Sequence, residues 1–424
     1  MGEKMKRHKI KTYDEENDEL MKSYWSRFLS GKHSKSNENL KIELLIENEN
    51  DFKKTNQKFT FLNNLELFLD WLTKNVHYSY QLNVWSRKLS DTKIELDSLR
   101  LIFRRLKEFK NKPTAVFVFS NFSFLFSQIY RDRLEKIIEC AETTGIPFIF
   151  LFIDEDKNNS YLKFSESGNK YCKDIFPFIK NYNLKYLGII SPGAVQDWKG
   201  KFLLFQKEFK RYNISSSQFY LTEEKEAIWN KKETKKFIDF IDFLINWSFH
   251  NLCGRKVNRF LDFLFQEKGY GILYNPLSEK SENIECCVGN NLCVRIKNLS
   301  IIPCYKIIAK PFILGRFKVG DNRILKLEPN NLELSIGLSS FDKKDLPMCE
   351  TCLLKYLCDG VCLWSQFKKT GDLFSPDPTV CRLKHGEIVN MIKNYKKLGI
   401  YNEIYDKLSK DKKDSLDFLS NLVF

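Results

Sequence analysis

The cysteines are the residues of this chain with the greatest capacity for chemistry, and they are unevenly distributed. The chain has 424 residues and 12 cysteines, and only Cys140, Cys172 and Cys253 lie in its first 285 residues. The N-terminal residues include no apolar stretch typical of a secretory signal, so we expect a cytoplasmic protein without a disulfide framework. Cysteines in this number then indicate metal or redox chemistry.

The most specific pattern is Cys349-x2-Cys352-x5-Cys358-x3-Cys362, followed by Cys381. Such close spacing places several thiolates within reach of one centre. Thiolates bind zinc or iron, and four of them complete a tetrahedral zinc site or hold one iron–sulfur cluster.

A second group of cysteines precedes this pattern and contains Cys286, Cys287, Cys293 and Cys304. Alternating apolar residues between them predict a β-hairpin that brings Cys286 and Cys304 together. Cys287 and Cys293 have an alternative interpretation as small buried side chains. The three cysteines of the first 285 residues are explained more simply in the same way.

The two groups together resemble the seven-cysteine SPASM domain, which follows the radical SAM barrel in enzymes that modify ribosomal peptides and proteins. Ile302-Pro303-Cys304 resembles the Tyr-Pro-Cys of that family, and Lys355–Cys362 is similar to its Arg-Tyr-Leu-Cys-Gly-Gly-Gly-Cys. One departure is Leu299, where the family has glycine at the hairpin turn. We expect Asn298 to form the turn instead, because asparagine tolerates a positive φ.

The resemblance implies two auxiliary 4Fe–4S clusters with interleaved ligands. The ligands of one cluster would be Cys349, Cys352, Cys358 and Cys381. The ligands of the other would be Cys286, Cys304 and Cys362, with Cys293, a neighbouring residue or the peptide substrate in the fourth position. The alternative for the same cysteines is a pair of structural zinc sites.

The elements that must position these cysteines begin with about six strand–helix repeats. Strands are predicted at 40–46, 78–85, 115–119, 148–153, 186–190 and 218–221. Helices are predicted at 61–75, 94–109, 130–143, 174–182, 202–212 and 234–246, and one more at 18–29. This alternation predicts parallel strands with right-handed crossovers, in either a barrel or an open doubly wound sheet. No Gly-x-Gly-x-x-Gly motif or P-loop supports a nucleotide-binding sheet.

A radical SAM enzyme holds its SAM-cleaving cluster on a Cys-x3-Cys-x2-Cys loop after the first barrel strand. Here the segment Glu47–Lys54 contains no cysteine, and no cysteine precedes Cys140. Oxygen ligands are poor substitutes for thiolates on a soft cluster. Trp85–Lys88 also stands where the family has a Gly-Gly-Glu. The resemblance therefore implies a degenerate radical SAM protein, and SAM is not expected as a cofactor.

We predict an α/β fold with a partial (β/α)6 TIM-like barrel, followed by a small cysteine-rich SPASM domain with a β-hairpin and short helices. The expected divisions are a polar basic extension at 1–38, the barrel at 39–250, the SPASM domain at 251–395 and a C-terminal helix at 396–424.

The expected function is that of an accessory protein in the maturation of a ribosomally synthesised peptide. It would bind two auxiliary 4Fe–4S clusters and the precursor peptide, and pair with an active radical SAM enzyme. The alternatives are a SAM-independent iron–sulfur enzyme that modifies the peptide, and a zinc-stapled binding module.

The charge and hydropathy of the chain exclude few classes of binding partner. The net charge of +15 agrees with an acidic peptide partner, but the basic residues are dispersed as on an ordinary solvated surface. No RNP motif or zinc-finger helix indicates nucleic-acid binding. No apolar run is long enough to span a membrane.

Overall fold

The computed structural model describes residues 40–46, 55–86, 92–154, 170–215, 218–224, 227–251, 291–340, 346–358 and 362–423. The predicted helix at 18–29 and the residues Cys253, Cys286 and Cys287 lie outside these ranges. Internal contacts divide the chain into two compact units. The first unit comprises 1–117, 139–148 and 287–340, and the second comprises 118–138, 149–286 and 341–424. The division into four consecutive segments stays a prediction.

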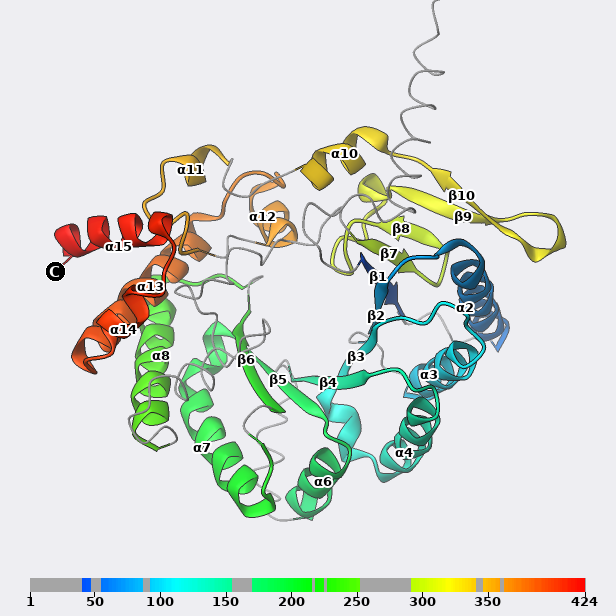
Figure 1. Ribbon diagram of the computed structural model, residues 1–424, viewed down its shortest axis with the longest axis horizontal. Helices are drawn as coiled ribbons and strands as arrows, with labels where there is room; N and C mark the ends of the chain where they lie inside the picture. The colour runs from blue at the N-terminus through cyan, green and yellow to red at the C-terminus, as the bar shows by residue number, and fades with distance from the viewer. Residues whose placement is uncertain are drawn as a thin grey trace, which may run out of the picture. The chain divides into compact units, whose positions relative to one another are not determined.

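The first six strands follow one another in chain order across the sheet (Figure 1). They are β1 (Leu40–Leu45), β2 (Tyr80–Trp85), β3 (Ala115–Asn121), β4 (Phe148–Asp154), β5 (Lys185–Ile190) and β6 (Phe219–Glu223). The pairs β1–β2, β4–β5 and β5–β6 are parallel. Sequential order is typical of a barrel wall, whereas a doubly wound sheet reverses its strand order at a switch point. The fold is therefore α/β, and its strand order agrees with the predicted partial barrel.

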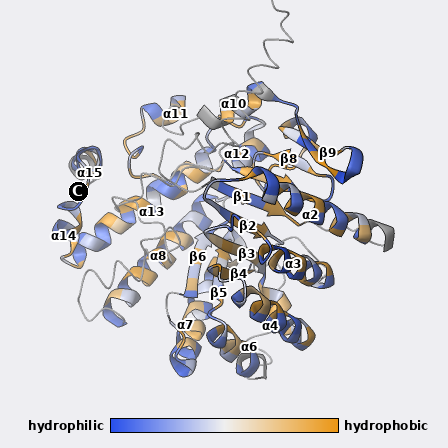
Figure 2. Cartoon of the chain, turned by 45° about the vertical axis from the view of Figure 1, so that its right-hand side comes forward, coloured by the Kyte–Doolittle hydropathy of each residue, from blue (hydrophilic) through white to orange (hydrophobic). Residues whose placement is uncertain are grey.

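A helix follows each of these strands, as predicted. These helices are α2 (Thr55–Asn75), α3 (Thr92–Leu106), α4 (Gln128–Glu142), α6 (Lys170–Asn181), α7 (Val195–Tyr212) and α8 (Lys231–Asn251). α2 begins six residues before its predicted start. The prediction missed these residues because most of them are polar and they carry no apolar periodicity. Figure 2 shows hydrophilic and hydrophobic residues mixed along the helices, as amphipathic packing requires.

The strands are apolar on both faces, which is typical of a parallel sheet covered on both sides. In β4 the sequence FIFLFID is almost continuously apolar, and its last five residues are buried. The exception in β4 is Asp154, a buried carboxylate at the end of the strand. Its Oδ2 lies 2.8 Å from Nζ of Lys201 and accepts a hydrogen bond from the Tyr186 hydroxyl at 2.9 Å. The ion pair and the hydrogen bond satisfy a charge that would be costly to bury alone.

Four further strands extend the sheet on the other side of β1, in the order β10-β9-β8-β7-β1. They are β7 (Leu292–Arg295), β8 (Ser300–Ile302), β9 (Gly315–Val319) and β10 (Leu325–Pro329). β7 pairs in parallel with β1 and antiparallel with β8. The predicted hairpin between the upstream cysteines is confirmed over the described residues.

The turn of this hairpin differs from our expectation. Leu299 itself has a φ of 55°, and Asn298 is not among the described residues with positive φ. The Asn298 side chain accepts hydrogen bonds from the backbone N and the hydroxyl of Ser300, at 3.3 and 2.8 Å. Leu299 is buried, so its apolar contacts offset the cost of the left-handed conformation.

The last part of the chain is helical. It contains α10 (Leu332–Ser340), α11 (Pro347–Glu350), α12 (Leu363–Thr370), α13 (Pro378–Lys397), α14 (Tyr401–Tyr405) and α15 (Lys410–Val423). α8 packs against both α7 and α13 (Figure 1). None of the helices that the structure describes is both long and apolar enough to cross a membrane.

Candidate metal centre in the cysteine-rich segment

Cys349 and Cys352 lie on one tight helical turn. Cys349 is in α11, and the backbone N of Cys352 donates to the Cys349 carbonyl at 3.1 Å. α11 starts at Pro347, whose missing N–H costs nothing in the first turn of a helix. The Cys-x2-Cys spacing therefore places two half-buried thiols about one turn apart, as in many metal sites.

Cys381 lies in the first turn of α13. Asp377 caps this helix, and its side chain accepts a hydrogen bond from the backbone N of Thr379 at 2.9 Å. Cys381 and His385 are four residues apart in α13, so they lie on the same face of the helix.

The structure brings these two elements together. The Sγ of Cys352 lies 3.5 Å from Nε2 of His385. Burial raises the pKa of Cys381 to about 11, and the neighbouring thiols of Cys349 and Cys352 and the carboxylate of Asp377 add to this rise. The thiol of Cys381 therefore lies within electrostatic range of the Cys-x2-Cys turn.

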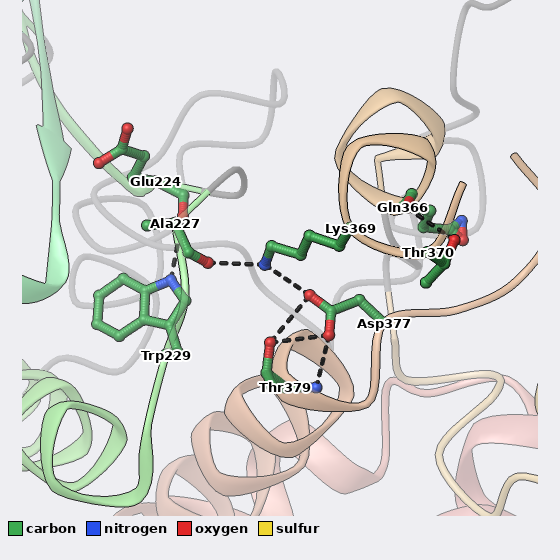
Figure 3. Close-up of polar contacts among 8 residues, drawn as sticks. All are labelled: Glu224, Ala227, Trp229, Gln366, Lys369, Thr370, Asp377 and Thr379. Atoms are coloured by element: carbon green, nitrogen blue, oxygen red, sulfur yellow. Dashed lines mark hydrogen bonds and ion pairs between the residues drawn. The ribbon is translucent and has the colours of Figure 1, made fainter. Parts of the chain in front are cut away.

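Lys369 holds the segment between α12 and α13 in place (Figure 3). Its Nζ donates to the Ala227 carbonyl at 2.7 Å and to the Asp377 carboxylate at 2.5 Å. Burial opposes the ionisation of Asp377, but the hydrogen bonds from Lys369 and Thr379 outweigh it and lower the pKa of Asp377. This network fixes the start of α13, and with it the backbone of Cys381, against the segment that follows β6.

The donor set fits a metal centre. Thiolates are soft ligands that suit zinc or an iron–sulfur cluster, and an imidazole also binds zinc or iron. The cysteines whose side chains the structure describes are free thiols. Within the described residues, no three His, Cys, Asp or Glu side chains already surround a common point in metal-binding geometry. Metal binding would therefore require the thiols to move toward one another.

The remaining predicted ligands are located as follows. Cys358 is half-buried between α11 and α12, and Cys362 is the N-cap residue of α12. Cys304 is half-buried after β8, in the first unit. Because Cys286 lies outside the described residues, the predicted group of Cys286, Cys304 and Cys362 stays a prediction.

Cys293 lies in the core of the first unit. Its side chain is fully buried in an apolar cluster with Leu45 and Ile302. This location favours the interpretation of Cys293 as a small buried side chain, and its role as a cluster ligand stays a prediction.

Glu43, in β1, carries a carboxyl group that lies beside Cys293 in the same unit. The side chain of Glu43 is 5% exposed, and burial raises its pKa, although hydrogen bonds with Cys293, Asn291 and Asn83 oppose the rise. The Asn291 amide donates to Oε1 of Glu43 at 3.3 Å. Sequence reasoning missed this buried carboxyl because Lys41 and Glu43 alternate with apolar residues in β1, and this pattern predicts an exposed polar face for Glu43.

The end of β2 is packed with aromatic side chains. Trp85 stacks on Tyr305 with ring centroids 3.8 Å apart and an interplanar angle of 9°. Both rings pack against the cluster of Leu45, Cys293 and Ile302. The position at which the resembling family has a glycine-rich segment is therefore occupied by a large apolar contact.

His385 is the residue of this site that sequence reasoning missed. The five histidines of the sequence form no pattern that indicates acid–base catalysis. The Cys381-x3-His385 spacing on one helix face, downstream of a Cys-x2-Cys turn, is the pattern that could have identified it.

The strand order and the helices define the fold as an α/β partial barrel. It is similar to solved structures of anSMEcpe. For the structure of native anSMEcpe with bound AdoMet and the Kp18Cys peptide, the TM-score is 0.54 and the sequence identity is 14%. The match covers 84% of this chain and 99% of that chain. For the structure of native anSMEcpe with bound AdoMet and the Cp18Cys peptide, the TM-score is 0.52 and the sequence identity is 12%. This match covers 85% of this chain and 99% of that chain. No protein-family model and no curated protein matches the sequence.

Proposed function

We propose that the protein is an accessory component in the maturation of a ribosomally synthesised peptide. It binds a precursor peptide and two auxiliary 4Fe–4S clusters, does not cleave SAM itself, and pairs with an active radical SAM maturase. The fold similarity to anSMEcpe with bound AdoMet and peptide supports a related, maturase-like role.

One observation carries the accessory role: a cysteine framework is present next to a barrel that lacks the SAM-cluster cysteines. β1 ends at Leu45, and the residues from Glu47 to Lys54 contain no cysteine. The carboxylates and amides there are hard oxygen ligands, which do not replace thiolates on an iron–sulfur cluster.

The proposed ligands form two separate cluster sites. Cys349, Cys352, Cys358 and Cys381 would hold one cluster, and the structure supports the proximity of three of these thiols. Cys286, Cys304 and Cys362 would hold the other. When bound, such clusters supply electron transfer or an open iron for a substrate thiolate.

Anaerobic reconstitution of the full chain with ferrous iron and sulfide tests the cluster part of the proposal. We expect about eight irons and a similar amount of sulfide per chain, since two 4Fe–4S clusters contain that number. Stoichiometric zinc without iron would contradict it.

The reconstituted protein should release no 5′-deoxyadenosine from SAM under reducing conditions, because the thiolates that bind a SAM-cleaving cluster are missing. A partner enzyme with an intact Cys-x3-Cys-x2-Cys loop should release it in the same assay. SAM cleavage by this chain alone would overturn the accessory role. Turnover of the precursor peptide by this chain alone would also overturn it.

A further inference from the structure

Large side chains fill the carboxyl ends of β1 and β2. Leu45 and Trp85 are the last residues of these strands and lie opposite each other in the parallel register. The backbone N of Ile46 donates to the Trp85 carbonyl at 2.9 Å, so the pairing continues beyond the strands. Because ligands of barrels with parallel strands bind at the carboxyl ends of the strands, Trp85 stands at the ligand end of this barrel.

Trp85 also lies on the inner face of the barrel wall. Phe317, in β9, packs against α2, with its ring centroid 4.6 Å from that of Trp71. The registers of β9 with β8, of β8 with β7 and of β7 with β1 place Leu44 on the same face as Phe317. Side chains alternate between the two faces along a strand. Leu45, and Trp85 opposite it, therefore lie on the face turned away from α2.

The Trp85 ring stacks on Tyr305 without space for a ligand between the two rings. Their centroids are 3.8 Å apart, and the ring planes are inclined by 9°. Carbon atoms in contact are about 3.5–4.0 Å apart, so a planar ligand ring would need about twice the observed separation. Both rings pack against the buried side chains of Leu45, Cys293 and Ile302. The stack is therefore continuous with the apolar wall behind it.

This apolar cluster does not fit SAM. SAM carries a sulfonium, an ammonium and a carboxylate group, and charged groups are costly to bury without polar partners. The cluster instead presents the side chains named above together with Ile308. The polar side chains two residues before the strand ends, Glu43 and Asn83, already accept hydrogen bonds from Asn291 and Gln81, at 3.3 and 2.7 Å.

We propose that Trp85 and Tyr305 form an aromatic plug, which occupies the ligand end of the barrel at β1 and β2 and prevents this chain from binding SAM. The plug goes beyond the loss of the cluster cysteines, because it excludes SAM whether or not a cluster is present. The partner enzyme therefore supplies the complete SAM site, a consequence that rests on the accessory role proposed above.

The direct test measures SAM binding by the unsubstituted full chain. Equilibrium dialysis uses SAM and, separately, S-adenosylhomocysteine, which lacks the sulfonium charge. Both the protein without iron and the anaerobically reconstituted protein are measured. We expect no saturable binding of either compound with a Kd below about 1 mM. Saturable binding of one molecule per chain would overturn the plug, and this measurement requires no variant to fold.

Trp85→Ala tests whether the indole ring fills an enclosed space. The substitution leaves an apolar cavity beside Tyr305, and such cavities bind apolar ligands of matching shape. The melting temperature should fall, and free indole should raise it again in a concentration-dependent way, because a ligand stabilises the folded state that binds it. Indole should not change the melting temperature of the unsubstituted protein. A variant that does not respond to indole would contradict the plug.

Two further variants complete this comparison. Trp247→Ala is the matched control, because Trp247 is a half-buried tryptophan in α8 that also contacts an aromatic ring, that of Phe202. Indole should not restore its melting temperature. If Trp85→Ala does not fold, Tyr305→Ala tests the other ring of the plug with phenol as the probe, and the same absence of a response would overturn the proposal.

These outcomes distinguish failure of the plug from failure of the proposed function. If the chain binds SAM but releases no 5′-deoxyadenosine, the plug is wrong and the accessory role stands. If the chain releases 5′-deoxyadenosine, both are wrong. If reconstitution yields no iron, the cluster part of the function is wrong, whereas the absence of SAM binding and the response of Trp85→Ala to indole still support the plug.

Discussion

At the residue scale, the fold has placed ionisable side chains in surroundings that change their pKa values in opposite directions. Burial dominates at Glu43 and favours its neutral form, whereas donated hydrogen bonds dominate at Asp377 and favour its ionised form. The two carboxyl groups therefore predict opposite dependences of stability on pH.

Glu43→Gln should stabilise the protein at pH 7. Because the pKa of Glu43 is raised in the folded state, the folded protein binds more protons than the unfolded chain between the two pKa values, and the stability falls as the pH rises through that range. Glutamine cannot ionise and can still accept the hydrogen bond from Asn291. Thermal unfolding between pH 4 and 8 should show a smaller fall for the variant.

The control for this comparison is Glu142→Gln, at an exposed position at the end of α4. We expect the control to leave the pH profile of the melting temperature unchanged. A Glu43→Gln variant that is less stable than the unsubstituted protein at every pH would contradict the assignment of burial as the dominant cause.

Asp377→Ala should destabilise the second unit by about 1–3 kcal/mol, because it removes a helix cap and leaves the Lys369 ammonium without its carboxylate. Asp377→Asn keeps the cap and should cost less. Since the pKa of Asp377 is lowered in the folded state, its contribution is present above the pKa of the unfolded chain, about 4, and is lost as the pH falls through the lower folded value. Denaturant unfolding at pH 7 and pH 3 measures both effects, and equal differences between aspartate and asparagine at the two pH values would refute the ion pair.

At the element scale, close packing between helices depends on one glycine. Gly386 in α13 faces Ile238 in α8, and a Cβ at Gly386 would collide with Cδ1 of Ile238. The absence of a side chain at Gly386 leaves room for the side chain of Ile238 against α13.

Gly386→Leu should push the Ile238 side chain away from α13 and destabilise the protein by about 1–3 kcal/mol, because the larger side chain overpacks this contact. Gly337→Leu, in α10, is a matched control, since a Cβ at Gly337 has no atom within 4 Å. Thermal unfolding compares the two variants. A Gly386→Leu variant as stable as its control would contradict this prediction. It would show that α8 and α13 accommodate the larger side chain without loss of stability.

The alternation of strands and helices in the sequence did not decide the order of the strands in the sheet. The periodicity at 40–46 or 148–153 identifies a strand but not its neighbours. The register of β1 with β2 and β7, and of β5 with β4 and β6, depends on the packing of α2 to α8 against the sheet. The distinction between a barrel and a doubly wound sheet therefore came from tertiary structure.

At the scale of the whole molecule, the second unit combines half of the barrel strands with all of the downstream cysteines from Cys349 to Cys381. The proposed metal binding at these cysteines would therefore be coupled to the stability of this unit, because ligands from separate elements are held together only in the folded state.

Removal of metal from the reconstituted protein with a chelator under anaerobic conditions should lower the melting temperature and expose residues 346–423 to proteolysis before the rest of the chain. The measurement is thermal unfolding with mass spectrometry of the first proteolytic fragments. Readdition of metal should restore both properties. An unchanged melting temperature and fragment pattern would show that the centre contributes nothing to folding.

The sequence by itself determined the α/β alternation, the hairpin around Leu299, the Cys-x2-Cys turn and the lack of a cysteine triad after the first strand. These are local properties, because spacing and periodicity report how one element uses its own faces. Only the tertiary structure decided the strand order, the left-handed Leu299, the burial of Cys293 beside Glu43, and the contact of His385 with Cys352. Each of these depends on packing between residues distant in the chain, which no local pattern encodes.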